Sequence, residues 1–431
     1  MKKIKFIDLF AGLGGTRIGF EQACEEENLS SECVFTSEIK PYAVQIYKHN
    51  FSDDIVHGDI TKINAAEIPD FDFLLGGFPC QAFSIAGRKA GFDDARGTLF
   101  FDIAKILKEK KPKGFLLENV EGLVTHDKRV KTSNIGNTLE TIITILTDLG
   151  YEVSWQVLNA KDFGVAQTRK RIYIAGSLVS KPQIREFEVK SQTFGDIQEH
   201  NLTPLNSAFT KNLLKLFSEK ELEGKSIKDK RGGDNNIHSW DMELKGKITR
   251  EQKILMNTIL TQRRRKKWAE IKGIVWMDGM PLTLNEVHSF CEHIDREKLR
   301  TMLDDLVEKK YLRFEHPKNL VEKDGKKLRE YAFDKEPGYN IVTGKLSFEL
   351  NKILGKSCVA PTIVATEADR IGVLDNGYIR RLSENECLRF FGFPTWYQSN
   401  ITHKELYDLI GNTVVVPVIK SVSQKIIRTL K

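Results

Sequence analysis

Short apolar runs that end in glycine or in an acidic residue recur along the first third of the chain. Residues 4–9 form the first run, which leads into a glycine-rich turn and then into a helical pattern that extends to about Glu27. Residues 71–75 and 115–117 form similar runs. Continuous apolar runs of this kind are typical of strands that are buried on both faces of a parallel sheet. The pattern therefore predicts an α/β domain in which strands alternate with helices.

The turn after the first run is Gly12-Leu13-Gly14-Gly15. A strand, a glycine turn and a helix open many nucleotide-binding folds, although an ordinary tight turn gives the same pattern. The turn lacks the Gly-Lys-Ser/Thr ending of a phosphate-binding loop, which argues against triphosphate chemistry. Glu38 follows the next predicted strand, 23 residues after Gly15, close to the separation at which an acid meets ribose hydroxyls. Asp59 is either a turn residue or an acceptor for an adenine amine.

Cys80 is the cysteine whose surroundings point to chemistry. The chain has six cysteines, and no two of them form a C-x-x-C pair, so we expect neither a metal site nor a disulfide framework. Cys80 follows Pro79 where the predicted strand 71–75 ends, and strand ends form the ligand-binding edge of an α/β sheet. A thiol at that edge is a candidate nucleophile. The alternative for any single cysteine is a small buried hydrophobic residue.

Five motifs follow one another in a fixed order. They are Asp8-Leu9-Phe10-Ala11-Gly12-Leu13-Gly14-Gly15, Gly77-Phe78-Pro79-Cys80-Gln81, Glu118-Asn119-Val120, Gln167-Thr168-Arg169-Lys170-Arg171 and Gly411-Asn412-Thr413-Val414-Val415-Val416-Pro417. Together they resemble the ordered motifs of the DNA (cytosine-5) methyltransferases, most closely the bacterial enzymes of restriction-modification systems. The resemblance covers residues 1–176 and 376–431. It implies an α/β fold in which a Rossmann-like, S-adenosylmethionine-dependent methyltransferase domain carries an inserted, smaller target recognition domain at 177–375.

The resemblance also implies a covalent reaction on a cytosine. Cys80 would add to C6, and Glu118 would hydrogen-bond or protonate N3, so that C5 can accept a methyl group. Shielding of Glu118 should raise its pKa, which suits a proton donor. Arg171 would lie near the base carbonyl and Arg169 near the nucleophile loop. The alternative for the two arginines is a surface pair on a strand edge.

The resemblance implies that the protein binds S-adenosylmethionine at a site formed by residues from both ends of the chain. The expected residues are Phe10, Ala11, Gly12, Leu13, Gly14, Gly15, Glu38, Ile39, Asp59, Ile60, Pro79, Leu99, Asn412 and Thr413. Phe10 would stack on adenine and Glu38 would hold the ribose. Many relatives carry a tryptophan where this chain has Ile39, so adenine would pack on an aliphatic side chain here.

The segment 81–99 contains three glycines and basic residues without a sustained apolar period, and it is predicted to be a basic loop. By resemblance it closes over duplex DNA whose target cytosine has been flipped out of the helix. The candidate DNA-binding residues in it are Gln81, Ser84, Arg88 and Arg96.

Basic charge gathers in the middle of the chain. Residues 211–270 hold 16 Lys and Arg against 9 Asp and Glu, an excess of seven that equals the net charge of the whole chain. Such a concentration suggests a nucleic-acid surface. Arg263, Arg264 and Arg265 open its densest run and are candidate DNA-binding residues; the alternative is a solvated helix face.

A winged-helix-like unit is predicted at about 281–335. Two helical patterns, the second capped by Asp295, precede two predicted strands at 311–314 and 329–333 that flank a charged turn. Winged helices commonly contact DNA. The second helix mixes acidic and basic residues, so a structural or protein-binding role is equally compatible with the sequence.

The last segment, 376–431, is expected to return to the catalytic domain, with a final helix that begins near Asn412 and closes the cofactor site. We expect a cytoplasmic monomer that acts on double-stranded DNA, has no membrane span and works beside a cognate restriction endonuclease. Two alternatives stay open from the sequence. They are a transfer-RNA cytosine-5 methyltransferase and a DNA-binding regulator that has lost catalysis.

Overall fold

The computed structural model describes residues 3–51, 55–78, 99–128, 134–229, 232–233, 235–275, 279–323, 326–342 and 348–430. Contacts divide the chain into two compact units. Unit 1 consists of Met1–His200, Lys356–Asp369 and Leu382–Lys431, and unit 2 consists of Asn201–Gly355 and Arg370–Arg381. Both ends of the chain therefore belong to unit 1. Residues 177–200 and 356–369, which we expected in the recognition domain, cluster with unit 1.

A mixed sheet forms the centre of unit 1. Within the described residues its seven strands lie in the order β3-β2-β1-β4-β5-β7-β6. Their bounds are β1 Lys3–Leu9, β2 Ser30–Ser37, β3 Val56–His57, β4 Phe73–Gly77, β5 Gly114–Val120, β6 Glu152–Asn159 and β7 Lys170–Ser177. Strands β1 to β5 pair in parallel, whereas β7 pairs antiparallel with β5 and with β6. The α/β prediction is confirmed, with an antiparallel edge that the apolar runs did not indicate.

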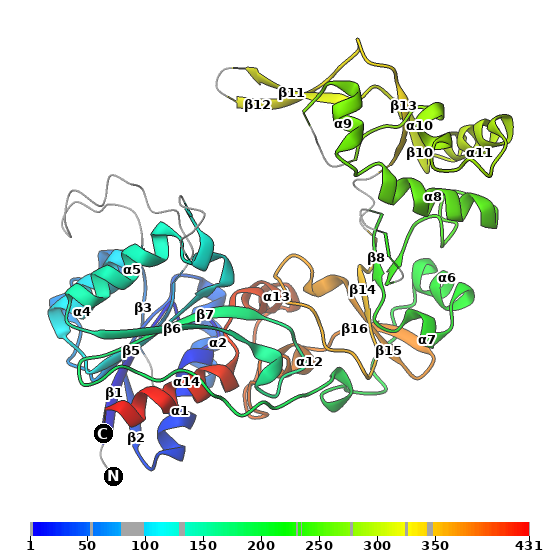
Figure 1. The fold of residues 1–431 in the computed structure, drawn as a ribbon. Helices are drawn as coiled ribbons and strands as arrows, with labels where there is room; N and C mark the ends of the chain where they lie inside the picture. Colours follow the sequence, from blue (N-terminus) through cyan, green and yellow to red (C-terminus); the bar gives the residue numbers. More distant parts are fainter. Residues whose placement is uncertain are drawn as a thin grey trace. The chain divides into compact units, whose positions relative to one another are not determined.

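Helices cover both faces of this sheet (Figure 1). The helices of unit 1 are α1 Gly15–Glu26, α2 Pro41–Asn50, α4 Leu99–Lys110, α5 Asn137–Asp148, α12 Glu384–Arg389, α13 His403–Asn412 and α14 Val416–Thr429. The side chains of α4 and α5 pack with one face of the sheet in a single apolar core. On the opposite face, α1 and α14 pack so closely that a Cβ atom on Gly19 would lie 2.7 Å from Ile419. The C-terminal helix is therefore an integral part of the first domain.

One predicted boundary is wrong. The final helix, α14, begins at Val416 and not near Asn412, which is the last residue of α13. Pro417 explains the later start, because proline lacks an N–H and is tolerated in the first turn of a helix, where α14 places it. Asn412 thus ends α13, and Thr413, Val414 and Val415 connect it to α14.

Unit 2 contains a small sheet and a helical module. The sheet has the strand order β16-β15-β14-β8-β9 in the described part of the unit, and α6 and α7 border it. The bounds are α6 Ala208–Leu216, α7 Glu219–Leu222, β8 Ser226–Ile227, β9 Asn236–Ile237, β14 Lys352–Leu354, β15 Ile371–Asp375 and β16 Tyr378–Arg381. Arg380 and Asp375 form an ion pair inside it, with 3.0 Å between Nε and Oδ2.

The helical module has a core of its own. Its elements are α8 Arg250–Gln262, α9 Lys267–Lys272, α10 Leu284–His288, α11 Arg296–Glu308, β10 Leu312–Glu315, β11 Lys318–Lys323, β12 Lys326–Tyr331 and β13 Gly338–Ile341. Asp295 caps α11 as predicted, since its Oδ1 accepts the N–H groups of Glu297 and Lys298 at 3.0 and 3.1 Å. The predicted pairing of the strands is wrong, because β10 pairs with β13 while β11 pairs with β12 as a separate hairpin. In Figure 1 this hairpin projects from the helices of the module.

In the parts of the chain that the structure describes, no helix is both long and apolar enough to cross a bilayer. The same parts contain no group of three His, Cys, Asp or Glu side chains that could hold a metal ion.

Candidate active site

A cavity of about 460 Å³ lies in unit 1 at the carboxyl ends of β1, β2, β4 and β5. This is the edge at which open α/β sheets bind ligands, and the volume suits a nucleotide-sized molecule. Its lining includes thirteen of the predicted site residues. They are Phe10, Ala11, Gly12, Glu38, Ile39, Asp59, Ile60, Leu99, Glu118, Arg169, Arg171, Asn412 and Thr413. Cofactor and reaction residues predicted from distant motifs thus border one cavity.

Among the predicted cofactor residues that the structure describes, three do not line it. Leu13 is fully buried, and its carbonyl accepts the Tyr397 hydroxyl at 2.7 Å. Gly14 has a φ of 75°, which favours glycine, and a Cβ there would lie 2.5 Å from the Phe51 ring. Gly15 begins α1. These three residues fix the conformation of the turn that contains Gly12 and follows Phe10.

The glycine turn leaves room for a ligand. Gly12 has a φ of 53°, and a Cβ there would meet only the Phe10 carbonyl, at 4.0 Å. Phe10 itself has a φ of 58°, a conformation that is costly for a residue with a side chain. Strain of this kind concentrates at ligand sites, where the surrounding structure holds it.

Glu38 joins the glycine turn to the second strand unit. Its Oε2 accepts the Gly12 N–H at 2.9 Å, and its Oε1 accepts the N–H groups of Ile39 and Lys40, both at 2.8 Å. A carboxylate has about four lone-pair positions, so Oε2 can accept a further hydrogen bond. Ile39 is 68% exposed and presents its aliphatic side chain to the cavity. Asp59 accepts the N–H and the hydroxyl of Thr61 with Oδ1.

Glu118 and Arg171 form an ion pair at the reaction end of the cavity. Arg171 Nε lies 3.1 Å from Glu118 Oε1, and both side chains are largely buried. Burial raises the pKa of Glu118, and the charges of Arg171 and Arg169 oppose this shift without cancelling it. The direction agrees with our expectation for this carboxyl. A carboxyl of raised pKa stays protonated to a higher pH than an ordinary glutamate, which suits a proton donor.

Arg169 is 2% exposed and ties three segments of unit 1 together. Its guanidinium donates to the carbonyls of Ile363 at 3.2 Å, Gly411 at 3.1 Å and Thr413 at 2.8 Å. Burial lowers the pKa of Arg169 to about 10, so the group stays charged at neutral pH. Its contacts hold the C-terminal wall of the cavity.

Asn119 is a contributor that sequence reasoning did not single out. It is 3% exposed, and its Nδ2 donates to the Phe78 carbonyl at 2.9 Å. That bond fixes the end of β4 just before the predicted nucleophile. Its place directly after Glu118 in a strand-end motif was the available signal. The cavity is further lined by Thr16, Ser37, Lys40, Gly77, Phe78, Val120, Leu409, Gly411 and Val414.

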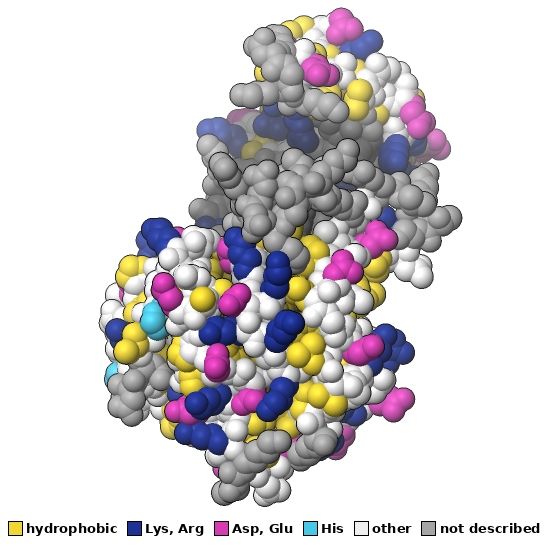
Figure 2. Space-filling model, turned by 90° about the vertical axis from the view of Figure 1, so that its left-hand side faces the viewer, with side chains coloured by type: hydrophobic (Ala, Val, Ile, Leu, Met, Phe, Trp, Pro, Cys, Tyr) yellow, Lys and Arg dark blue, Asp and Glu magenta, His cyan; other side chains and the backbone are white. Residues whose placement is uncertain are grey.

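Nine predicted site residues need separate mention. Pro79, Cys80, Gln81, Ser84, Arg88 and Arg96 lie outside the described residues. Arg263 is 4% exposed, and its Nη1 donates to Asn340 Oδ1 at 2.6 Å, so its guanidinium is used inside unit 2 and does not face solvent. Arg264 is half-buried, and Arg265 is exposed. On the face shown in Figure 2, acidic and basic side chains are interspersed over the lower body, so charge there does not single out one DNA surface.

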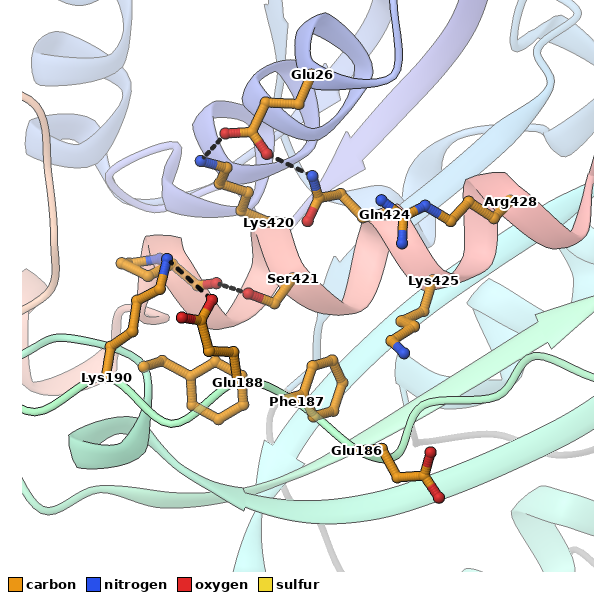
Figure 3. A pocket seen from close by; sticks show the side chains of 12 residues that line it. Glu26, Glu186, Phe187, Glu188, Lys190, Lys420, Ser421, Gln424, Lys425 and Arg428 are labelled. Atoms are coloured by element: carbon orange, nitrogen blue, oxygen red, sulfur yellow. Dashed lines mark hydrogen bonds and ion pairs between the residues drawn. The ribbon is translucent and has the colours of Figure 1, made fainter.

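A second cavity of about 330 Å³ lies in unit 1 beside α14 (Figure 3). Its charged groups are mostly paired with one another: Glu26 accepts hydrogen bonds from Lys420 and Gln424, and Lys190 lies 3.7 Å from Glu188. The cation of Lys425 lies 5.7 Å from the centre of the Phe187 ring. With neither a glycine turn nor a strand end in its lining, this cavity offers no comparable chemistry.

Comparisons with known proteins identify the family to which the chain is similar. The family model described as C-5 cytosine-specific DNA methylase matches residues 4–428. The chain is 56% identical over 430 residues to the type II methyltransferase M.NlaIV of Neisseria lactamica and 54% identical to M.NgoBV of Neisseria gonorrhoeae, with 100% of both chains covered in each case. It is 39% identical to M.BanI of Aneurinibacillus aneurinilyticus over 97% of this chain and 95% of that one. Among solved structures, S. pombe Dnmt2 methyltransferase aligns with this chain over 100% of both chains, with a TM-score of 0.53 and 14% identity. This similarity supports the fold alone.

Proposed function

The chain belongs to the C-5 cytosine-specific DNA methylase family, and we propose that it methylates C5 of a cytosine flipped out of a short, specific duplex sequence. It is a DNA cytosine-5 methyltransferase, and its full-length similarity to type II methyltransferases assigns it to restriction and modification. The observation that carries the proposal is the Glu118–Arg171 pair, which borders the same cavity as the glycine turn and Glu38.

The cavity fits S-adenosylmethionine, which supplies the methyl group as a sulfonium when bound. Gly12 leaves open space at the turn, and Glu38 retains acceptor capacity for ribose hydroxyls. Phe10 and Ile39 would contact the adenine, with Asp59 and Ile60 at its edge. The remaining residues proposed to hold the cofactor are Ala11, Pro79, Leu99, Asn412 and Thr413, whereas Leu13, Gly14 and Gly15 are proposed to support it only through the shape of the turn.

Glu118 is proposed to supply the proton that cytosine needs at N3. Its pKa is raised by burial, so a fraction of the carboxyl is protonated closer to neutral pH than in an ordinary glutamate. Protonation of N3 keeps negative charge off the ring while a nucleophile adds at C6. Arg171 holds Glu118 Oε1 in place, which leaves the other oxygen to face the base. When the nucleophile departs, the proton returns from N3 to Glu118.

Cys80 is the proposed nucleophile, on the evidence of its motif. Its sulfur would bond to C6, which makes C5 electron-rich; after methylation C5 loses its proton, the C6–S bond breaks and the ring becomes aromatic again. Asn119 supports this role indirectly, because it anchors the Phe78 carbonyl two residues before Cys80. Arg169 supports it by holding the opposite wall of the cavity.

The substrate is proposed to be duplex DNA. A cytosine inside a duplex cannot be reached from two sides, so it must leave the stack at a cost of a few kcal/mol, about the worth of several phosphate contacts. The residues proposed to supply such contacts are Gln81, Ser84, Arg88, Arg96, Arg264 and Arg265. Unit 2 is proposed to carry target recognition. An enzyme that modifies duplex DNA of a bacterial cell would act in the cytoplasm, as a monomer beside a cognate endonuclease.

Base-resolution methylation mapping tests this function. Mixed-sequence duplex DNA is incubated with S-adenosylmethionine and wild type, Cys80→Ala or Glu118→Gln, and transfer RNA serves as a parallel substrate. We expect methylation at one short duplex motif by wild type and none by Cys80→Ala. Methylation of transfer RNA but not DNA would overturn the DNA assignment, and equal methylation by Cys80→Ala would overturn the nucleophile.

A further inference from the structure

A carboxylate on α13 ties two walls of the cofactor cavity together. Asp408 Oδ2 accepts a hydrogen bond from Lys40 Nζ at 2.6 Å and another from the Tyr42 hydroxyl at 2.6 Å. Lys40 belongs to the loop after β2, and 368 positions separate it from Asp408 in the sequence. We call these three residues, Asp408, Lys40 and Tyr42, the Asp408 latch. None of the five sequence motifs includes a residue of the latch.

The latch connects directly to residues that line the cavity. On one wall, the Lys40 N–H donates to Glu38 Oε1, and Glu38 Oε2 accepts the Gly12 N–H. On the other wall, Asn412 Nδ2 donates to the Asp408 carbonyl at 2.9 Å. A continuous set of hydrogen bonds therefore runs from the glycine turn through Glu38 and Lys40 to Asp408 and Asn412.

Both charged members of the latch are ionised at neutral pH. Partial burial raises the pKa of Asp408, but the hydrogen bonds from Lys40 and Tyr42 outweigh it and the net shift is downward. Partial burial lowers the pKa of Lys40, and the contact with Asp408 outweighs that effect, so the net shift is upward. Each side chain is 39% exposed, so the ion pair itself is screened, and the shared acceptor for Tyr42 adds to its strength.

We propose that Asp408 is a positioning residue for cofactor binding, which holds the Glu38 loop against α13 and so slows dissociation of S-adenosylmethionine. The inference rests on the proposed function, in which this cavity binds the cofactor. The latch has no contact with Glu118 or Arg171 among its hydrogen bonds in the described residues, so the methyl-transfer step should not depend on it. Its loss should act on cofactor affinity alone.

The chain offers a matched control in Glu26. This carboxylate of α1 accepts hydrogen bonds from Lys420 and Gln424 of α14 (Figure 3). It resembles Asp408 in joining the N-terminal half of unit 1 to a C-terminal helix through a lysine and a second donor. It borders the second cavity and not the cofactor cavity.

The test compares Asp408→Asn, Tyr42→Phe and Glu26→Gln with wild type in the full chain. Binding of S-adenosylmethionine without DNA is measured by calorimetry and its dissociation rate by stopped flow. For Asp408→Asn we expect about three- to tenfold weaker binding through faster dissociation, the effect of losing one partly exposed charged contact and its hydrogen bonds. Tyr42→Phe should fall between Asp408→Asn and wild type, and Glu26→Gln should bind as wild type does.

Two further readouts separate positioning from general stability. The kcat of Asp408→Asn at saturating cofactor should stay within about twofold of wild type, and hydrogen exchange of the Lys40 amide in the cofactor-free protein should accelerate. If Asp408→Asn binds S-adenosylmethionine as tightly as wild type does, or if Glu26→Gln loses as much affinity as Asp408→Asn, the role of the latch is overturned. The proposed function would still stand in either case, because the wild-type protein binds the cofactor. Failure of wild type itself to bind S-adenosylmethionine would overturn the proposed function and, with it, the latch.

Discussion

Arg169 of unit 1 and Arg263 of unit 2 are both buried arginines, but their contacts differ. Arg169 donates to three backbone carbonyls and borders the cavity in which Glu118 and Arg171 lie. Arg263 donates to Asn340, which in turn donates to Glu315 Oε1 at 2.7 Å. These two hydrogen bonds join the end of α8 to the strands of the helical module. The first guanidinium supports a reaction site, and the second fills an interior. Residue type and burial alone therefore do not identify function; the groups that share the cavity do.

The largest expected effect concerns the chemistry of unit 1. Glu118→Gln keeps the shape of the side chain but cannot hold a transferable proton, so we expect kcat to fall by about 10²- to 10⁴-fold. Affinity for S-adenosylmethionine should change little. Single-turnover methylation and calorimetry on the same preparation measure the two effects.

The pH profile sharpens this prediction. Because burial raises the pKa of Glu118, the protonated form should persist above the ordinary range of a glutamate, and the methylation rate of wild type should decline as pH rises through that raised pKa. The residual activity of Glu118→Gln should lack this decline. An identical alkaline decline in Glu118→Gln would assign the titration to another group.

The two arginines can be compared directly. Arg169→Met leaves three carbonyls without their charged donor, and Arg263→Met leaves Asn340 without its own, so each should lower the free energy of unfolding by about 2–5 kcal/mol. Only Arg169→Met should also weaken S-adenosylmethionine binding, by about tenfold or more, because Gly411 and Thr413 line the cavity. Denaturant unfolding and calorimetry check both expectations. A similar loss of cofactor affinity in Arg263→Met would break the distinction between the two regions.

Asp8 should make the stability of unit 1 depend on pH. Burial raises the pKa of this carboxyl to about 7, against a smaller lowering by its hydrogen bond from the Thr16 hydroxyl at 2.7 Å. The folded state therefore binds the proton more tightly than the unfolded state, so this contribution to stability is full below pH 4 and is lost as pH rises to about 7. The free energy of unfolding can fall by about 1.4 kcal/mol for each pH unit in this range.

The substitution Asp8→Asn should remove this dependence of the free energy of unfolding on pH. Urea unfolding of wild type and Asp8→Asn between pH 4.5 and pH 8 would measure the difference. Parallel stability curves for the two proteins would show that Asp8 does not titrate in this range.

The smallest expected effect concerns DNA contacts of unit 2. Arg265→Ala removes one exposed cation, so the slope of log K against log salt should fall by about 1 and DNA affinity by a few-fold, with cofactor affinity unchanged. Lys298→Ala is the control, because Lys298 is already paired with Glu251 at 2.8 Å. Equal salt slopes for wild type and Arg265→Ala would remove this residue from the DNA surface.

How far the sequence predicted the molecule depended on the physical origin of each feature. The strands β1, β4 and β5 were predictable because burial on both faces demands apolar runs, and Glu118 because a chemically reactive residue stood at a strand end. The start of α14 was misplaced by a few residues, since the helical pattern around Asn412 does not reveal that one helix ends and another begins there.

Contacts between distant segments were not predictable. Asp408 meets Lys40 across 368 positions, and nothing local distinguishes it from an ordinary surface acid. The strands of the helical module were anticipated but not their partners, because β10 pairs with β13 across the intervening hairpin of β11 and β12. Arg263 begins a basic run whose later members, Arg265 and Lys267, are exposed, and its contact with Asn340 joins positions 77 residues apart.

The central claim is that one cavity joins cofactor binding to a covalent attack assisted by Glu118. The most direct test uses duplex DNA in which 5-fluorocytosine replaces the target cytosine, because fluorine at C5 blocks the proton loss that releases the enzyme. In the presence of S-adenosylmethionine, wild type should form a complex with this DNA that survives denaturation, Glu118→Gln should form it much more slowly, and Cys80→Ala should not form it. A denaturation-resistant complex with Cys80→Ala, or equal rates for wild type and Glu118→Gln, would contradict the account.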